Sequence, residues 1–180
     1  KTGKIRSWNR VGQRVTPGEP EQMAREFLTN NADAFGFKPD LSDLKLKRVR
    51  SGQDGFHRME FTQTHNGIPV YGSDIGVNLT ESGDIRNTFS NYKINIALKD
   101  TVTTVSESQA IQTSLNFLRI LETPEKEPEA NLMVFPYQKS RLVYVVSFFI
   151  EDPLGEWEII VGNVPKCCDA LKPFVLDLNN

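Results

Sequence analysis

The fold of this 180-residue chain is decided by residues 63–79, QTHNGIPVYGSDIGVNL. The stretch lies where two runs of alternating apolar and polar residues meet, and such period-two alternation is typical of half-buried strands. Between the runs, the pair Asn66-Gly67 favours a type I′ turn, because both central residues of that turn need positive φ. Pro69 lacks an N–H, so residues 68–71 are expected to form an edge or a bulge. The stretch predicts a bent antiparallel pair with an irregular, exposed corner.

The same residues resemble a known family motif. NGIPVYG followed by alternating apolar residues is similar to the core of the FTP domain, the fungalysin/thermolysin propeptide module. The resemblance is carried by Gln63, Asn66, Gly67, Ile68, Pro69, Val70, Tyr71 and Gly72. One interpretation is that the corner touches a protease. The contact residues would then be Asn66, Gly67, Pro69, Tyr71 and Gly72. The alternative interpretation is structural, with the glycines permitting the bend and Pro69 preventing stray strand pairing.

Residues 1–99 are expected to form one unit of helix and antiparallel sheet, the FTP-like domain. A short opening strand over 4–11 carries Ile5 and Trp8 as its apolar anchors. One helix is expected over 19–35, because apolar residues recur there at helical spacing, and Gly36 is suited to end it. Strands are then expected over 44–50, 56–64, 75–80 and 85–92. The basic patch of Lys45, Lys47, Arg48 and Arg50 is expected to be a solvated strand face that protects an edge.

Residues 100–180 repeat this plan after a boundary placed at 99–104. Ser106 and Gln109 have the spacing of a capping box, and the helix that begins there is expected to end at Thr123-Pro124. Strands are expected over 132–137, 141–150 and 157–161; the middle one is apolar on both faces, which is typical of a central or covered strand. The predicted fold class is α+β, with two tandem helix-plus-antiparallel-sheet units of cystatin-like type.

The second half resembles the PepSY domain through SESQAIQTSLNFL, RLVYVVSFFI and GEWEIIV. In that family an FTP domain precedes the PepSY domain, and both precede a zinc metalloprotease domain, so the order here matches. The tail departs from the family pattern from about residue 162. Residues 162–168 are an insertion, and Lys172-Pro173 stands where the family has Thr-Gly. Proline cannot take the positive φ that glycine supplies, so this turn must differ.

Charge and composition exclude several classes of partner and scaffold. The 21 basic and 23 acidic residues give a net charge of −2, which provides no electrostatic reason to expect a nucleic acid or an anionic membrane. No apolar run approaches the roughly 20 residues that span a bilayer. The amino-terminal residues lack the apolar segment of a signal peptide. Only two cysteines are present, which excludes a disulfide framework and a four-cysteine zinc site.

The sequence contains no catalytic motif, so the chain is expected not to be an enzyme and to hold neither a metal nor a cofactor. It lacks the HExxH of zinc proteases, the G-x-S-x-G elbow and the glycine-rich phosphate loops. Its two histidines, His57 and His65, lie on one expected strand, about 26 Å apart if that strand is straight. They cannot bind one metal ion unless the chain folds back.

Two further motifs have alternative interpretations. Cys167 and Cys168 suggest a cysteine switch, in which a thiolate caps the zinc of a partner protease. The cysteines are otherwise expected to lie in an exposed loop, or to form a vicinal or intermolecular disulfide. Asn78 begins an N-glycosylation sequon, which matters only in a chain secreted through an endoplasmic reticulum.

The family resemblance implies that the chain is the propeptide of a secreted thermolysin-like or fungalysin-like zinc metalloprotease. It would act as an intramolecular chaperone for the catalytic domain and inhibit that domain until it is removed. The C-terminal segment, including Leu178, Asn179 and Asn180, is expected to occupy the protease cleft. The alternative is a stand-alone secreted or envelope-associated FTP/PepSY binding module, including one that inhibits a protease in trans. An HExxH-containing domain encoded after Asn180 would favour the propeptide.

Overall fold

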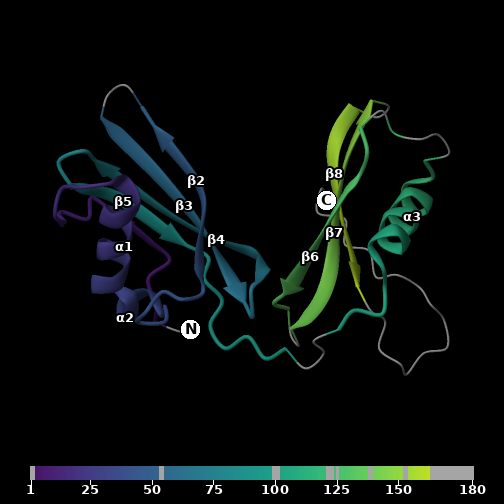
Figure 1. Ribbon diagram of the computed structural model, residues 1–180, viewed down its shortest axis with the longest axis horizontal. Helices are drawn as coiled ribbons and strands as arrows, with labels where there is room; N and C mark the ends of the chain where they lie inside the picture. The colour runs from purple at the N-terminus through teal and green to yellow at the C-terminus, as the bar shows by residue number, and fades with distance from the viewer. Residues whose placement is uncertain are drawn as a thin grey trace. The chain divides into compact units, whose positions relative to one another are not determined.

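The computed structural model describes residues 3–52, 55–98, 102–120, 124, 126–137, 140–151 and 154–162. Its fold is α+β, and the chain divides into two compact units, Lys1–Ile96 and Ala97–Asn180 (Figure 1). None of the helices in the described residues is long and apolar enough to cross a membrane. Nearly all of the insertion at 162–168, and the Lys172-Pro173 turn after it, lie outside the described residues.

The first unit contains an antiparallel sheet with strand order β1-β5-β4-β3-β2. The alternating patterns predicted these strands, although β1 is shorter than expected and β4 begins seven residues earlier than expected. The bounds are β1 (Ser7–Asn9), β2 (Leu44–Ser51), β3 (Phe56–His65), β4 (Ile68–Thr80) and β5 (Ile85–Ser90).

The helical segment of the first unit is interrupted, so the expectation of one helix over 19–35 is wrong. Helix α1 (Pro20–Asn30) is followed by the single turn α2 (Ala32–Phe35). Between them Asn31 leaves the helical region, with φ −118° and ψ 14°. Its side-chain amide donates to the Phe27 carbonyl at 2.8 Å, so the asparagine competes with the backbone for the helix's own acceptor. Gly36 ends α2 at φ 81°, as predicted.

The core of the first unit lies between the helices and one face of the sheet (Figure 1). The alternation predicted in β3 and β4 is confirmed, because the side chains of one parity are buried against the helix. Each such large apolar side chain contributes roughly 1.5–3 kcal/mol when it is fully buried. Ile5 and Trp8, the predicted anchors of the first strand, pack against this core. Its largest buried side chains are Met23, Phe27, Leu28, Phe35, Met59, Phe61, Ile75, Val77 and Leu79.

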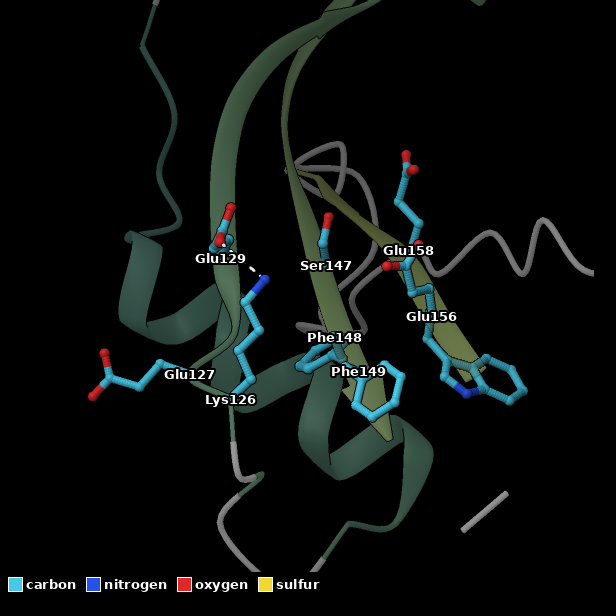
Figure 2. Close-up of a pocket in the computed structure, with 9 residues that line it drawn as sticks. Lys126, Glu127, Glu129, Ser147, Phe148, Phe149, Glu156 and Glu158 are labelled. Carbon is cyan, nitrogen blue, oxygen red and sulfur yellow. Dashed lines mark ion pairs between the residues drawn. The ribbon is translucent and has the colours of Figure 1, made fainter. Parts of the chain in front are cut away.

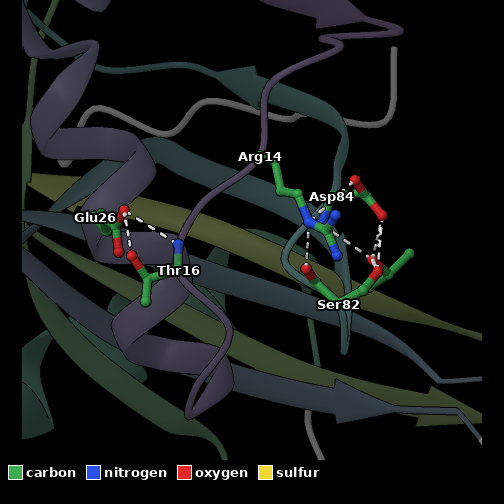
Figure 3. A network of polar contacts seen from close by, with 6 residues as sticks. Arg14, Thr16, Glu26, Ser82 and Asp84 are labelled. Atoms are coloured by element: carbon green, nitrogen blue, oxygen red, sulfur yellow. Dashed lines mark hydrogen bonds and ion pairs between the residues drawn. The ribbon is translucent and has the colours of Figure 1, made fainter.

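Polar contacts attach the segment between β1 and α1 to the rest of the first unit (Figure 3). Arg14 donates to the Ser82 carbonyl at 2.9 Å, and its Nε lies 3.8 Å from Asp84 Oδ1. The Ser82 hydroxyl donates to Asp84 Oδ2 at 2.7 Å, and this bond is the main cause that lowers the pKa of Asp84. At the other end, Thr16 donates to the Glu26 carboxylate on α1. The amino-terminal segment is therefore fixed to both layers.

The second unit packs one helix on a three-stranded antiparallel sheet of order β6-β7-β8 (Figure 1). The central position of β7 is confirmed: Val146 and Phe148 are buried toward α3, and Val143 and Val145 are buried on the opposite face. Phe149, at the end of that second face, is exposed. The bounds are α3 (Glu107–Leu118), β6 (Glu129–Phe135), β7 (Arg141–Glu151) and β8 (Leu154–Gly162).

Helix α3 begins as predicted and ends earlier than predicted. The Ser106 hydroxyl accepts from the Gln109 N–H at 3.2 Å, and the Gln109 side chain accepts from the Ser106 N–H at 2.9 Å, which completes the capping box. The expected end at Thr123-Pro124 is wrong, because Arg119 already adopts the left-handed conformation at φ 55°. The Ile120 N–H then bonds the Leu115 carbonyl in the pattern of a Schellman motif.

Candidate partner-binding site

The corner between β3 and β4 has the turn and the bulge that its sequence predicts. Asn66 and Gly67 both have positive φ, 52° and 82°, and they form the turn between the strands. Pairing begins with His65 opposite Ile68 and then jumps from Thr64–Pro69 to Thr62–Asp74. Residues 70–73 therefore have no directly paired partner on β3. The five predicted partner-binding residues of this region all lie in the turn, in the bulge or between them.

Buried hydrogen bonds hold the bulge in one conformation. Ser73 is 1% exposed, and its hydroxyl accepts from the Gln63 N–H at 3.2 Å while it donates to the Val70 carbonyl at 2.6 Å. Gly72, at φ 62°, takes the left-handed conformation that the bend requires. Val70 is buried, so the bulge is pinned on the inside both by an apolar side chain and by a hydroxyl.

Gln63 connects the corner to the chain that follows β5. Its side-chain amide donates to the Lys93 carbonyl at 3.0 Å and accepts from the Lys93 N–H at 2.9 Å. The adjacent Thr64 N–H donates to the Asp43 carbonyl at 2.7 Å. Both contacts act on the last residues of β3 before the turn. The end of the hairpin is therefore held by hydrogen bonds to two segments that are distant in sequence, one at Lys93 and one at Asp43.

A buried tyrosine and aspartate complete this support. The Tyr92 hydroxyl donates to Asp43 Oδ2 at 2.7 Å. Burial of the hydroxyl, together with this bond and the negative charge of Asp43, raises the pKa of Tyr92. Burial also lowers the pKa of the neighbouring Lys93, and repulsion from Arg6 adds to that effect. Asp43, Ser73 and Tyr92 were not singled out from the sequence, because nothing local marks a polar residue whose partner is distant.

The structure brings together five of the eight predicted partner-binding residues. Asn66, Gly67 and Gly72 are exposed, and Pro69 and Tyr71 are half-buried beside them. Ile68, also half-buried, lies on the same turn. The other three predicted residues, Leu178, Asn179 and Asn180, lie outside the described residues, as do Cys167 and Cys168. The described candidate site is therefore the corner alone.

Asn78, the asparagine of the sequon, lies on β4 away from the corner and on the face opposite the core. Its side chain is half-buried, and its amide donates to the Asn87 side-chain oxygen on β5. Attaching a glycan to this nitrogen would replace one of its two hydrogens and leave the other able to donate. Glycosylation of Asn78 stays a prediction that no contact supports or contradicts.

The corner suits contact rather than chemistry. It presents an exposed backbone turn beside a half-buried proline, a half-buried apolar side chain and a half-buried phenol. Within the described ranges, no group of three or more histidine, cysteine, aspartate or glutamate side chains is placed to hold a metal ion. His57 and His65 lie at opposite ends of β3, and the His57 ring is bonded to the Ser51 hydroxyl at 2.8 Å. A fixed, partly apolar surface of this kind matches what a protein partner needs.

The second unit has an open hollow of about 440 Å³ on its sheet, bordered by glutamates from β6 and β8 (Figure 2). Lys126 lies 3.5 Å from Glu129, but both side chains are largely exposed, so this ion pair contributes little. Figure 2 shows Glu127 and Glu158 directed away from each other. These carboxylates are best explained as solvated ends of strand residues.

Comparison with known proteins matches part of the chain. Residues 42–92 match the Fungalysin/Thermolysin Propeptide Motif. Neutral protease B of Bacillus subtilis (strain 168) is 27% identical over 143 residues, which are 74% of this chain and 25% of that protein. The chain thus spans about a quarter of the length of this relative. Among solved structures, the Bacillus megaterium YpeB C-terminal domain has a TM-score of 0.41 and 12% identity, covering 93% of this chain and 67% of that one.

Proposed function

We propose that this chain is the prosegment of a secreted thermolysin-like or fungalysin-like zinc metalloprotease and is not itself catalytic. It assists the folding of the catalytic domain and inhibits that domain until the prosegment is removed. The observation that carries the proposal is the Fungalysin/Thermolysin Propeptide Motif at residues 42–92, a range that contains the corner and both residues of the Asp43–Tyr92 pair. The similarity to neutral protease B supports it, since that protein is named as a protease.

The corner has the physical properties that a folding template needs. A template must keep its own shape while it binds a partner that has not finished folding, and it then stabilises the partner's native state by mass action. Ser73, Gln63 and Asp43 fix the corner through bonds that are formed before any partner arrives. Little conformational entropy remains to be lost on binding, which favours affinity. Pro69 and Tyr71 are the side chains assigned to the contact.

The remaining parts of the chain have proposed roles that rest on family resemblance. Residues 1–99 form the FTP-like domain, and residues 100–180 form the PepSY-like domain. The segment from 162 to 180, with Leu178, Asn179 and Asn180, lies in the protease cleft and provides the inhibition. A second candidate function is a stand-alone secreted or envelope-associated binding module. The departure of this segment from the family pattern, with KCC at 166–168 and proline at 173, favours that second function.

The first test is the reading frame beyond Asn180, where the proposal expects a domain that contains HExxH. The second test is inhibition of that catalytic domain by the chain. Inhibition by an equimolar amount is expected, with loss of most of it on deletion of residues 163–180. Refolding of the denatured catalytic domain gives the third readout, and the chain is expected to increase the yield of native protease. A chain that neither inhibits nor assists refolding contradicts the proposal, and a frame that ends without a protease domain favours the stand-alone module.

A further inference from the structure

We infer that the helix-free face of the first unit's sheet carries a second binding site, a groove that takes an acidic polypeptide segment. The groove has a volume of about 390 Å³, and it lies at the end of β3 and β4 opposite the corner. Register places Arg50, Arg58, Asn78 and Asn87 in one row across β2, β3, β4 and β5. Phe56 and Arg86 line the groove beside that row, together with Gly52 and His57.

The groove is positively charged, and the described residues that line it include no carboxylate. Three arginines line it. Arg58 is paired with Glu60 at 3.0 Å, and the charge of Arg86 helps to lower the pKa of Asp84. Within the described ranges, neither Arg50 nor Arg86 forms a direct ion pair with a carboxylate. The groove belongs to the more basic part of the chain, with 14 basic and 11 acidic residues in 1–96 against 7 and 12 in 97–180. Its charge therefore favours an anionic occupant.

The chemistry of the lining points to carboxylate side chains in particular. A guanidinium presents a planar fork of donors that matches a carboxylate, and Arg50 and Arg86 keep that fork available. The Asn78 amide donates to the Asn87 oxygen, which leaves the Asn87 nitrogen to donate to an occupant. These donors approach the same hollow from β2 and β5. Carboxylates of neighbouring residues in one segment can reach them together.

Phe56 makes the site one for a peptide rather than for a free anion. Its side chain is 42% exposed, and the Arg86 guanidinium lies 5.7 Å from the centre of its ring. An inorganic anion uses the charge but gains nothing from an exposed aromatic ring. A segment with an apolar residue between its carboxylates uses both, and arginine with an aromatic side chain is a combination enriched in protein interfaces. The inference does not depend on the proposed function, because the groove and the corner are separate surfaces.

The experiment measures binding of the probe peptide Ac-Glu-Glu-Leu-Glu-Glu-NH2 to the full 180-residue chain. NMR of the 15N-labelled chain reports the affinity and the residues that respond. The matched peptide Ac-Gln-Gln-Leu-Gln-Gln-NH2 tests the requirement for charge, and inorganic phosphate tests a free anion. The variants are Arg50→Glu, Arg86→Glu and Phe56→Ala, with Lys45→Glu as the control. Lys45 is exposed on the same strand and has the same charge change, but it lies outside the groove.

The glutamate peptide is expected to shift the amide signals of Arg50, Phe56 and Arg86 and to bind more weakly as salt rises. Arg50→Glu and Arg86→Glu should each weaken binding about tenfold, and Phe56→Ala about threefold, while Lys45→Glu leaves it within about twofold. Because all three groove side chains are at least partly exposed, thermal unfolding should be nearly unchanged in the variants. If Lys45→Glu weakened peptide binding as much as the groove variants do, the peptide would be attracted by the overall positive charge of the surface, and the proposed site would be wrong. Binding of the glutamine peptide or of phosphate as tight as that of the glutamate peptide would also overturn it.

Discussion

Tyr92 Oη donates a 2.7 Å hydrogen bond to Asp43 Oδ2, and the two side chains are only 5% and 6% exposed. The Lys38 ammonium lies 3.9 Å from the same carboxylate oxygen but is mostly in solvent, so it compensates the buried charge only in part. The backbone carbonyl of Asp43 accepts the Thr64 N–H just before the turn at the corner. The pair therefore joins the core of the first unit to the surface proposed to meet a protease.

Replacing Tyr92 by phenylalanine should destabilise the first unit by about 2 kcal/mol, because it leaves a buried carboxylate oxygen without its donor. Asp43→Asn should cost less, since the amide oxygen can still accept from Tyr92 and no charge is buried. Urea unfolding followed by Trp8 fluorescence in a Trp157→Phe background measures this, because Trp8 packs on the first unit's core. A change below about 0.5 kcal/mol in Tyr92→Phe would show that the bond contributes nothing net.

The same hydroxyl should make stability depend on alkaline pH. The pKa of Tyr92 is raised in the folded chain, whereas an unfolded tyrosine titrates near 10. The stabilisation is therefore fully present below about pH 10 and is lost as pH rises toward the folded pKa, by up to about 1.4 kcal/mol per pH unit. The stability difference between wild type and Tyr92→Phe should be constant from pH 7 to 9 and shrink between pH 10 and 11. A difference that stays constant to pH 11 contradicts a raised pKa.

The sequence predicted the parts of the first unit that depend on local pattern. The alternation of Met59 and Phe61 placed one face of β3 in the core, and Asn66-Gly67 placed the turn. Gln63 belongs to the same parity and is buried as well, but its role depends on Lys93, thirty residues away. Long-range partners of this kind, like that of Asp43, have no local sequence signal.

Bulges explain why the groove was not predicted. The basic patch at 45–50 was expected to form one solvated face of a regular strand. A register shift between Leu46 and Arg48 changes the parity of β2, so that Lys45, Arg48 and Arg50 pair with residues of one face of β3. A second shift, after Asn78, leaves Arg86 beside that row. Each shift moves the side chains that follow it to the other face, and neither follows from residue type alone.

Gly76 should not tolerate alanine, because Phe89 covers it. A Cβ at this position would collide with the ring of Phe89, and the two residues are directly paired across β4 and β5. Gly76→Ala is expected to cost about 2 kcal/mol, since the ring must leave its place on the sheet. Gly18→Ala, where the nearest atom is 3.8 Å from the new Cβ, serves as the control in urea unfolding. Independent effects of Gly76→Ala and Phe89→Ala in a double-mutant cycle would show that the ring is not the obstacle.

Loss of the cap on α3 should destabilise the second unit selectively. Ser106→Ala removes the acceptor of the Gln109 N–H and should cost about 1 kcal/mol. Ser106→Asp should retain most of the stability, because aspartate is also a good cap. Trp157 fluorescence in a Trp8→Phe background reports this unit, since Trp157 packs against the helix cluster. Ser108→Ala, at the second residue of the same helix, should have almost no effect on stability. An equal loss of stability in both serine variants contradicts the capping box.

The corner should contribute to inhibition through Pro69 and Tyr71. Changing Tyr71 to serine removes the largest half-buried side chain of the corner, and as a contact of hot-spot type it should weaken inhibition of the cognate catalytic domain by about tenfold or more. Pro69→Ala should have a smaller effect, because the pairing of residue 69 with Thr64 does not require proline.

The matched control is Tyr137→Ser in the second unit, where the tyrosine is 63% exposed. Thermal unfolding of each variant separates contact from stability, because a true contact lowers inhibition at temperatures where both chains remain folded. Unchanged inhibition by Tyr71→Ser, with the deletion of 163–180 still abolishing it, would assign the contact to the tail and leave the corner a purely structural bend.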